Sequence, residues 1–146
     1  MKLSKDSKEF IELLNSTKVK YLLVGGHAVA YHGHPRFTGD MDFFVERSPE
    51  NARKLEQVLA AFGFASLGLK AHDFLEPGTV IQLGRAPYRI DLLTSIDAVE
   101  FTEAWAARIG AVMDDMPVFI ISKDLLIRNK KVIDREQDRA DIKKMI

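Results

Sequence analysis

The sequence VGGHAVAYHG at residues 24–33 and the sequence TGDMDFFV at residues 38–45 decide the fold of this chain. In the first, an apolar run over residues 21–24 stops at Gly25 and Gly26. This pattern predicts a buried strand, a tight turn and then a short helix. In the second, an apolar run follows two acids and predicts another strand. The loop between the two stretches contains glycine and proline.

Asp40 and Asp42 stand two residues apart at the start of this second strand. Their side chains should therefore point to the same face, with Cα atoms roughly 6.5 to 7 Å apart. Two carboxylates in this position repel each other unless a cation lies between them. Mg²⁺ is the expected cation, because it prefers oxygen ligands and commonly takes one or two carboxylates together with substrate phosphates. Because the pair follows a glycine-bearing loop, we expect the site at an edge of the sheet.

Asp91 interrupts a further apolar run and is the third acid of interest. An acid within such a strand is costly to bury unless it is paired. If the two acid-bearing strands are neighbours, Asp91 joins Asp40 and Asp42 in one carboxylate site. Two ordinary alternatives stay open at this point, because Asp40 can serve as a turn residue and Asp91 can pair with Arg89 or Arg36.

The remaining pattern predicts an α+β chain with a central mixed sheet flanked by helices, organised as a single domain over residues 1–146. Serines followed by helix-forming residues mark several helix starts. Further strands are bounded by glycine, proline and aspartate. We expect helices at about 5–16, 49–62, 99–107 and 122–131 and from 136 onward, and further strands at 79–83, 88–94, 111–113 and 118–121.

The amino-acid composition excludes several kinds of functional site and partner. The 146 residues include 21 basic and 21 acidic residues and no cysteine. A zero net charge gives no overall basic field, so we expect no stable DNA binding. The lack of cysteine excludes a thiolate zinc site and a thiol nucleophile, and His27, His32 and His34 lack the helical spacing of a zinc site. No apolar leader or membrane span is evident, so we expect a cytoplasmic protein.

The ordered set of a strand, Gly25-Gly26, a helix, Asp40-Met41-Asp42 on a strand and a later Asp91 resembles the DNA-polymerase-beta-like nucleotidyltransferase superfamily. It is most similar to the minimal bacterial members, including abortive-infection toxin-type proteins. The segment at 126–142 also resembles the closing helices of that subgroup, so the resemblance covers nearly the whole chain.

The resemblance implies a Mg²⁺-dependent enzyme that transfers a nucleoside monophosphate from an NTP to a hydroxyl of a protein, a tRNA or a small molecule. Gly25, Gly26 and the following helix N-terminus would hold the triphosphate, which agrees with the anion-binding tendency of helix starts. Asp40 and Asp42 would bind Mg²⁺, and two ions are expected. Asp91 would bind the second ion and help to deprotonate the attacking hydroxyl.

Other nucleotide-binding candidates follow from the same resemblance. Many members carry serine where this chain has Gly26, so Thr38 or the backbone would have to replace its hydroxyl. Arg36 could contact phosphates, Lys130 could reach the site from the C-terminal helix, and His27 could touch substrate. The ordinary alternatives are a solvated loop arginine, a surface lysine on a helix and a packed or solvated histidine.

The alternative function is a non-catalytic nucleotide- or partner-binding module of a toxin–antitoxin-like pair with a cognate partner protein. The short chain favours it, because no obvious segment remains to bind an acceptor. Haloacid-dehalogenase-type phosphatases and sugar-nucleotide glycosyltransferases also use an Asp-x-Asp motif. Both place the motif after a strand, whereas here the strand follows it.

Overall fold

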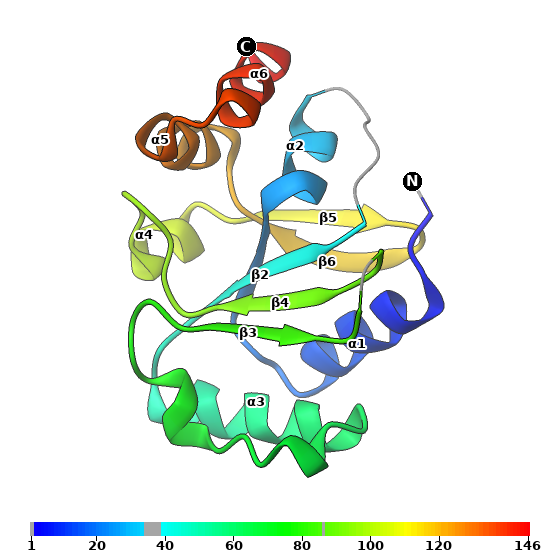
Figure 1. The fold of residues 1–146 in the computed structure, drawn as a ribbon. Helices are drawn as coiled ribbons and strands as arrows, with labels where there is room; N and C mark the ends of the chain where they lie inside the picture. Colours follow the sequence, from blue (N-terminus) through cyan, green and yellow to red (C-terminus); the bar gives the residue numbers. More distant parts are fainter. Residues whose placement is uncertain (1, 34–38, 86) are drawn as a thin grey trace.

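The computed structural model describes residues 2–33, 39–85 and 87–146, which form a six-stranded mixed sheet with helices on both faces (Figure 1). The strand order is β3-β4-β2-β1-β6-β5. The α+β class predicted from the sequence is confirmed. The elements are α1 (Lys5–Ser16), β1 (Tyr21–Val24), α2 (Gly25–His32), β2 (Met41–Val45), α3 (Pro49–Ala61), β3 (Val80–Leu83), β4 (Ile90–Leu93), α4 (Phe101–Ala106), β5 (Ile109–Met113), β6 (Met116–Ile120), α5 (Lys123–Ile133) and α6 (Glu136–Met145).

The side chains of β2 point alternately to the two faces of the sheet. The Phe43 ring packs against Phe10 of α1, with ring centroids 5.7 Å apart. Its neighbour Phe44 packs against Phe101 of α4, with centroids 5.1 Å apart. Successive side chains on a strand point to opposite faces, so Asp42 lies on the same face as Phe44. The acids therefore face the side of the sheet that α2 and α4 cover, whereas α1 and α3 cover the other side.

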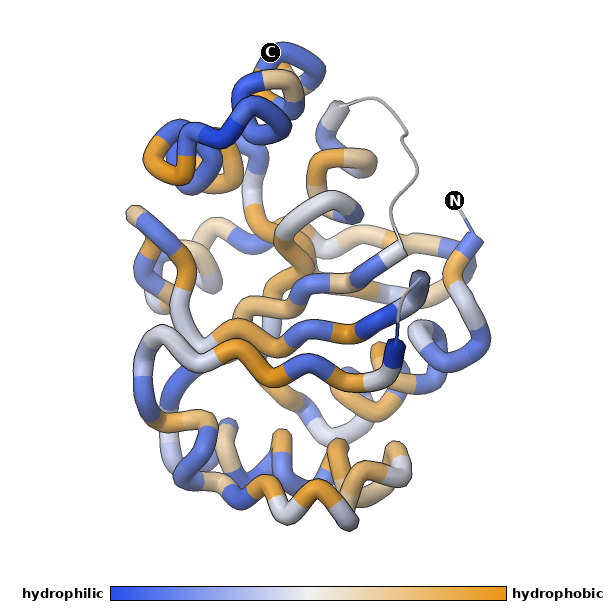
Figure 2. The backbone as a smooth tube through the Cα atoms, in the orientation of Figure 1, coloured by the Kyte–Doolittle hydropathy of each residue, from blue (hydrophilic) through white to orange (hydrophobic). Residues whose placement is uncertain are grey.

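The acid-bearing strands are interior strands of the sheet. Strand β2 pairs with β1 on one side in antiparallel fashion and with β4 on the other side in parallel fashion. The acids nevertheless lie at the edge formed by the strand ends, because Asp40 precedes β2 and Asp42 pairs with Val24, the last residue of β1. Figure 2 shows mostly hydrophobic strands with short hydrophilic interruptions that lie side by side on β2, β4 and β3.

Local signals set most helix boundaries. Ser4, Ser48 and Ser122 each cap a helix by accepting a hydrogen bond from a backbone N–H three residues later. The expected helices and strands are present with small shifts at their ends. The segment between α3 and β3, for which no element was expected, contains two 3₁₀ helices, Ala65–Leu67 and Ala71–Phe74.

None of the helices in the described part of the chain is long and apolar enough to cross a membrane.

Candidate active site

Asp42 and Asp91 lie directly opposite each other on the neighbouring strands β2 and β4. Residues paired across parallel strands point to the same face, so the two carboxylates face the same space. Asp91 is buried, with 6% of its surface exposed, and Asp42 is partly buried. Asp40 immediately precedes β2, and its side chain accepts a hydrogen bond from the backbone N–H of Arg89. The pairing of β2 with β4 thus brings the three predicted acids into one region.

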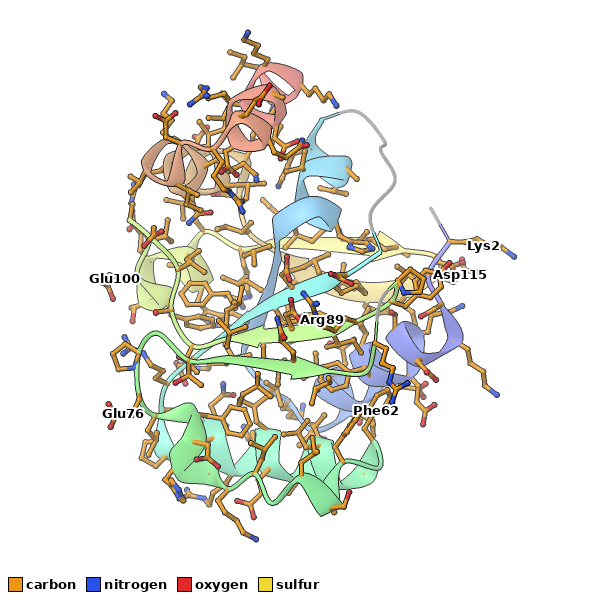
Figure 3. All side chains as sticks on the ribbon, viewed as in Figure 1. Lys2, Phe62, Glu76, Arg89, Glu100 and Asp115 are labelled. Atoms are coloured by element: carbon orange, nitrogen blue, oxygen red, sulfur yellow. The ribbon has the colours of Figure 1, made fainter. Side chains whose placement is uncertain are left out.

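Arg89 lies between two of these acids. Its Nε donates to Asp91 Oδ1 at 2.7 Å and its Nη2 donates to Asp91 Oδ2 at 3.0 Å. The same Nη2 lies 3.2 Å from Asp40 Oδ2. The ion pair between Asp91 and Arg89 that the sequence left open as an alternative is therefore present. Figure 3 shows Arg89 over the face of the sheet.

Asp42 has a strongly perturbed carboxyl group. Burial is the largest cause, and the negative charge of Asp91 and a hydrogen bond shared with it add to the effect. Asp40 raises the pKa further, whereas Arg89 opposes the shift, and the result is a pKa of about 7 instead of 3.8. Asp42 therefore lacks a full counter-charge. A divalent cation would supply one.

In the observed side-chain conformations, the described residues contain no group of three or more acids or histidines that could hold a metal ion. The Arg89 guanidinium pairs with both Asp40 and Asp91. Mg²⁺ commonly uses only one or two carboxylates and completes its octahedron with waters and phosphates. Asp42 and Asp91 fit that requirement once Arg89 moves away from Asp91, with Asp40 as a further oxygen ligand.

Gly25 forms the bend between β1 and α2 and lies against Asp42. Its φ of +67° is in the left-handed region that favours glycine. A Cβ added at Gly25 would collide with Asp42 Oδ2. The absence of a side chain therefore lets the backbone at the start of α2 approach the carboxylate. Any anion bound at this helix start would lie beside Asp42.

Gly25→Ala should destabilise the protein and displace Asp42. The left-handed backbone alone costs about 1 to 2 kcal/mol for a residue with a Cβ, and the collision adds to that cost. Gly68→Ala is the matched control, because Gly68 has a φ of +70° and an added Cβ there would meet nothing within 4 Å. Urea unfolding of both variants separates the two effects. Equal losses of unfolding free energy would mean that the contact with Asp42 is unimportant.

A pocket of about 360 Å³ opens beside Gly25 and Asp42. The sheet forms its floor, and α5 forms one wall through Asn129 and Lys130. Arg135, which immediately precedes α6, completes the cationic side. The remaining lining residues are Val24, Gly78, Leu93, Ser95, Ile96, Asp97 and Ile133. The pocket thus combines two carboxylates, Asp42 and Asp97, with a helix start and two cations.

Lys130 belongs to a buried ion cluster between α5 and α6. Its Nζ lies 3.0 Å from Asp138 Oδ1 and 3.1 Å from Asp141 Oδ2. Both aspartates have no exposed surface, and Lys130 is 5% exposed. Arg135 binds the second oxygen of Asp138 at 2.6 Å and holds the pKa of that carboxyl well below its usual range. The interpretation of Lys130 as a surface lysine is therefore wrong. It lines the pocket while fixing α6 to α5.

The other predicted nucleotide-binding residues either do not line the pocket or lie outside the described residues. His27 is buried within α2 and Gly26 is partly exposed in its first turn, and neither lines the pocket. Arg36 and Thr38 lie outside the described residues. The sequence interpretation missed Arg135 as a pocket residue. The available signal was a basic residue between the end of one predicted helix and the start of the next.

The stability of the protein should fall as the pH rises from about 4 to about 7, by about 3 kcal/mol from Asp42 alone. The folded carboxyl keeps its proton up to a pKa of about 7, whereas the ordinary value is 3.8. In this window the folded state therefore binds more protons than the unfolded state, and raising the pH favours unfolding. Asp42→Asn should flatten this part of a curve of urea-unfolding free energy against pH, measured without divalent metal. The exposed Glu76→Gln should leave it unchanged.

Comparisons with known proteins support the fold. No protein-family model matches the chain, and no curated protein matches it by sequence. Among solved structures, it is similar to a crystal structure from Thermotoga maritima described as a "putative nucleotidyltransferase". The TM-score is 0.62 and the identity 13%, and the match covers 94% of this chain and 88% of the other. The chain therefore has a nucleotidyltransferase-like fold.

Proposed function

We propose that the protein is a nucleotidyltransferase that transfers a nucleoside monophosphate from an NTP to a hydroxyl group, with release of pyrophosphate. The observation that carries this proposal is the register pair of Asp42 and Asp91 beside the Gly25 bend. The nucleotidyltransferase-like fold supports it. Asp42 lines one pocket together with an anion-attracting helix start and a cationic wall, and Asp91 lies next to Asp42 on the neighbouring strand.

Each part of the pocket has a role in this proposal. Asp42 and Asp91 would hold Mg²⁺, with Asp40 as an additional ligand, and the metal would supply charge neutralisation at the phosphates and at the attacking oxygen. The backbone at Gly25 and the start of α2 would receive phosphate oxygens. Arg135, whose side chain is 68% exposed, can contact a phosphate from the opposite wall.

The acceptor hydroxyl must lose a proton during transfer. Asp91, which accepts two hydrogen bonds from Arg89, would hold a metal after Arg89 is displaced and would help to accept the proton of the hydroxyl. Asp42, whose pKa is raised to about 7 without a cation, would lose its proton when Mg²⁺ binds. We therefore expect transfer activity to require a divalent cation and to decline below neutral pH, because protons compete for the same oxygens.

Incubation with Mg²⁺ and each of the four α-³²P-labelled NTPs tests the proposal. The reactions should include purified protein alone, total tRNA and a cell extract, so that label in protein, RNA or a small molecule identifies the acceptor class. Metal-dependent label transfer is the expected result. Nucleotide binding without transfer to any acceptor would contradict catalysis.

A specific observation favours the second candidate function, a non-catalytic nucleotide- or partner-binding module. Arg89 already pairs with Asp40 and Asp91, so the acid site has an internal cation. In that case the protein would bind NTP with equal affinity with and without Mg²⁺. A toxin–antitoxin-like role would then require a cognate partner, which co-purification of the product of an adjacent gene would reveal.

A further inference from the structure

Arg89 binds two of the carboxylates that would hold the metal. The guanidinium makes a two-point contact with Asp91 and a further ion pair with Asp40. Such fork-like pairs are stronger and more directional than single contacts. The side chains of Arg89 and Asp91 are 30% and 9% exposed, so water screens this pair only in part.

A divalent cation needs the same oxygens that Arg89 binds. Both Asp91 oxygens accept from the guanidinium, Asp40 Oδ1 accepts from the backbone N–H of Arg89, and Asp40 Oδ2 lies 3.2 Å from Nη2. A metal bound to Asp91 would also place like charge next to the guanidinium. Metal and guanidinium therefore compete for one site, and binding of the metal must include displacement of the Arg89 side chain.

We propose that Arg89 is a built-in counter-cation that suppresses binding of divalent metal alone and makes the metal and the nucleotide bind together. This inference rests on the proposed function and adds the control of its metal site. The triphosphate brings several negative charges, which can hold the displaced guanidinium as well as the metal. Nucleotide binding thus offsets the cost of displacement, and the coupling between the two ligands is reciprocal.

Replacing the guanidinium tests the competition without measuring catalysis. Mn²⁺ binding is measured by electron paramagnetic resonance of the free ion, for the wild type, Arg89→Gln and Arg85→Gln. Arg85 is the matched control, because it is an exposed arginine in the same hairpin. Arg89→Gln should bind Mn²⁺ alone about tenfold or more tightly than the wild type, and Arg85→Gln should bind it like the wild type.

The second readout is the coupling with nucleotide. A non-hydrolysable NTP should tighten Mn²⁺ binding by roughly tenfold or more in the wild type, and by much less in Arg89→Gln. Because Arg89→Gln leaves the buried Asp91 without its partner, its thermal midpoint is also measured. It should be lowered without metal and recover more with Mn²⁺ than the wild type does. If Arg89→Gln does not fold, Arg89→Lys replaces it, with a smaller gain expected because lysine lacks the two-point contact.

The outcomes separate this inference from the proposed function. Equal Mn²⁺ affinity in the wild type and Arg89→Gln, with the same tightening by nucleotide in both, would overturn the role of Arg89 and leave the metal site intact. Mn²⁺ binding by neither protein, even with nucleotide, would overturn the proposed function itself. Weaker Mn²⁺ binding by Arg89→Gln would overturn the inference as well, since it would mean that Arg89 supports the metal site.

Discussion

Asp42→Asn is expected to lower the rate of nucleotidyl transfer by about a thousandfold, because a neutral amide removes several kcal/mol of interaction with the metal and the developing charge. The same change should raise the stability of the protein without metal at about pH 8, since it relieves the repulsion that gives Asp42 its high pKa. Label transfer and urea unfolding measured on one preparation test both effects. A loss of activity could then not be attributed to unfolding.

The matched control for this variant is Glu76→Gln, which also replaces one carboxylate by an amide. Glu76 is exposed before β3 and lies away from the acid pair (Figure 3). Its activity and stability should equal those of the wild type. An Asp42→Asn protein that keeps a tenth or more of the wild-type rate would contradict a metal-binding role for Asp42.

Lys130→Met is expected to lower the free energy of unfolding by about 3 to 5 kcal/mol, the usual cost of removing one partner from a buried ion pair. The substitution keeps the length and the apolar stem of the side chain and leaves Asp138 and Asp141 buried with one cation fewer. Urea unfolding provides the measurement. Since α6 is held to α5 by this cluster, hydrogen exchange should also become faster in α6.

Arg128→Gln on the same helix is the control for Lys130→Met. Arg128 makes two hydrogen bonds to Glu103, but both side chains are about half exposed. Exposed ion pairs contribute about 0 to 1 kcal/mol, so this variant should be close to the wild type. Similar losses for the two variants would contradict the distinction between the buried cluster and a surface pair.

Local patterns in the sequence predicted the elements well, because capping serines, glycine bends and apolar runs act over a few residues. Ser48 followed by Pro49 sets the start of α3, as expected from the preferences of the first helical positions. The two 3₁₀ helices between α3 and β3 had no such signal. Buried Phe74 anchors this segment through contacts with the rest of the fold, which local periodicity does not encode.

The arrangement of the candidate site depends on pairing between strands that lie far apart in the sequence. Asp42 lies opposite Asp91 because β2 and β4 pair in parallel. The sequence allowed this pairing but did not determine it. The ion pair between Arg89 and Asp91 was expected only as an alternative. Residue spacing alone does not determine whether an arginine side chain contacts an acid or solvent. In α6, Asp138, Asp141 and Met145 share the buried side at helical spacing, which was an overlooked signal that Lys130 has buried partners.

The proposed function requires that Asp42 and Asp91 bind divalent cations beside the Gly25 bend. A crystal grown with Mn²⁺ and a non-hydrolysable NTP, measured for anomalous scattering, tests it most directly. We expect an anomalous peak within about 2.0 to 2.2 Å of carboxylate oxygens of both residues, with the Arg89 guanidinium moved away and phosphates at the start of α2. Nucleotide bound without such a peak, and with Arg89 still paired to Asp91, would contradict the account.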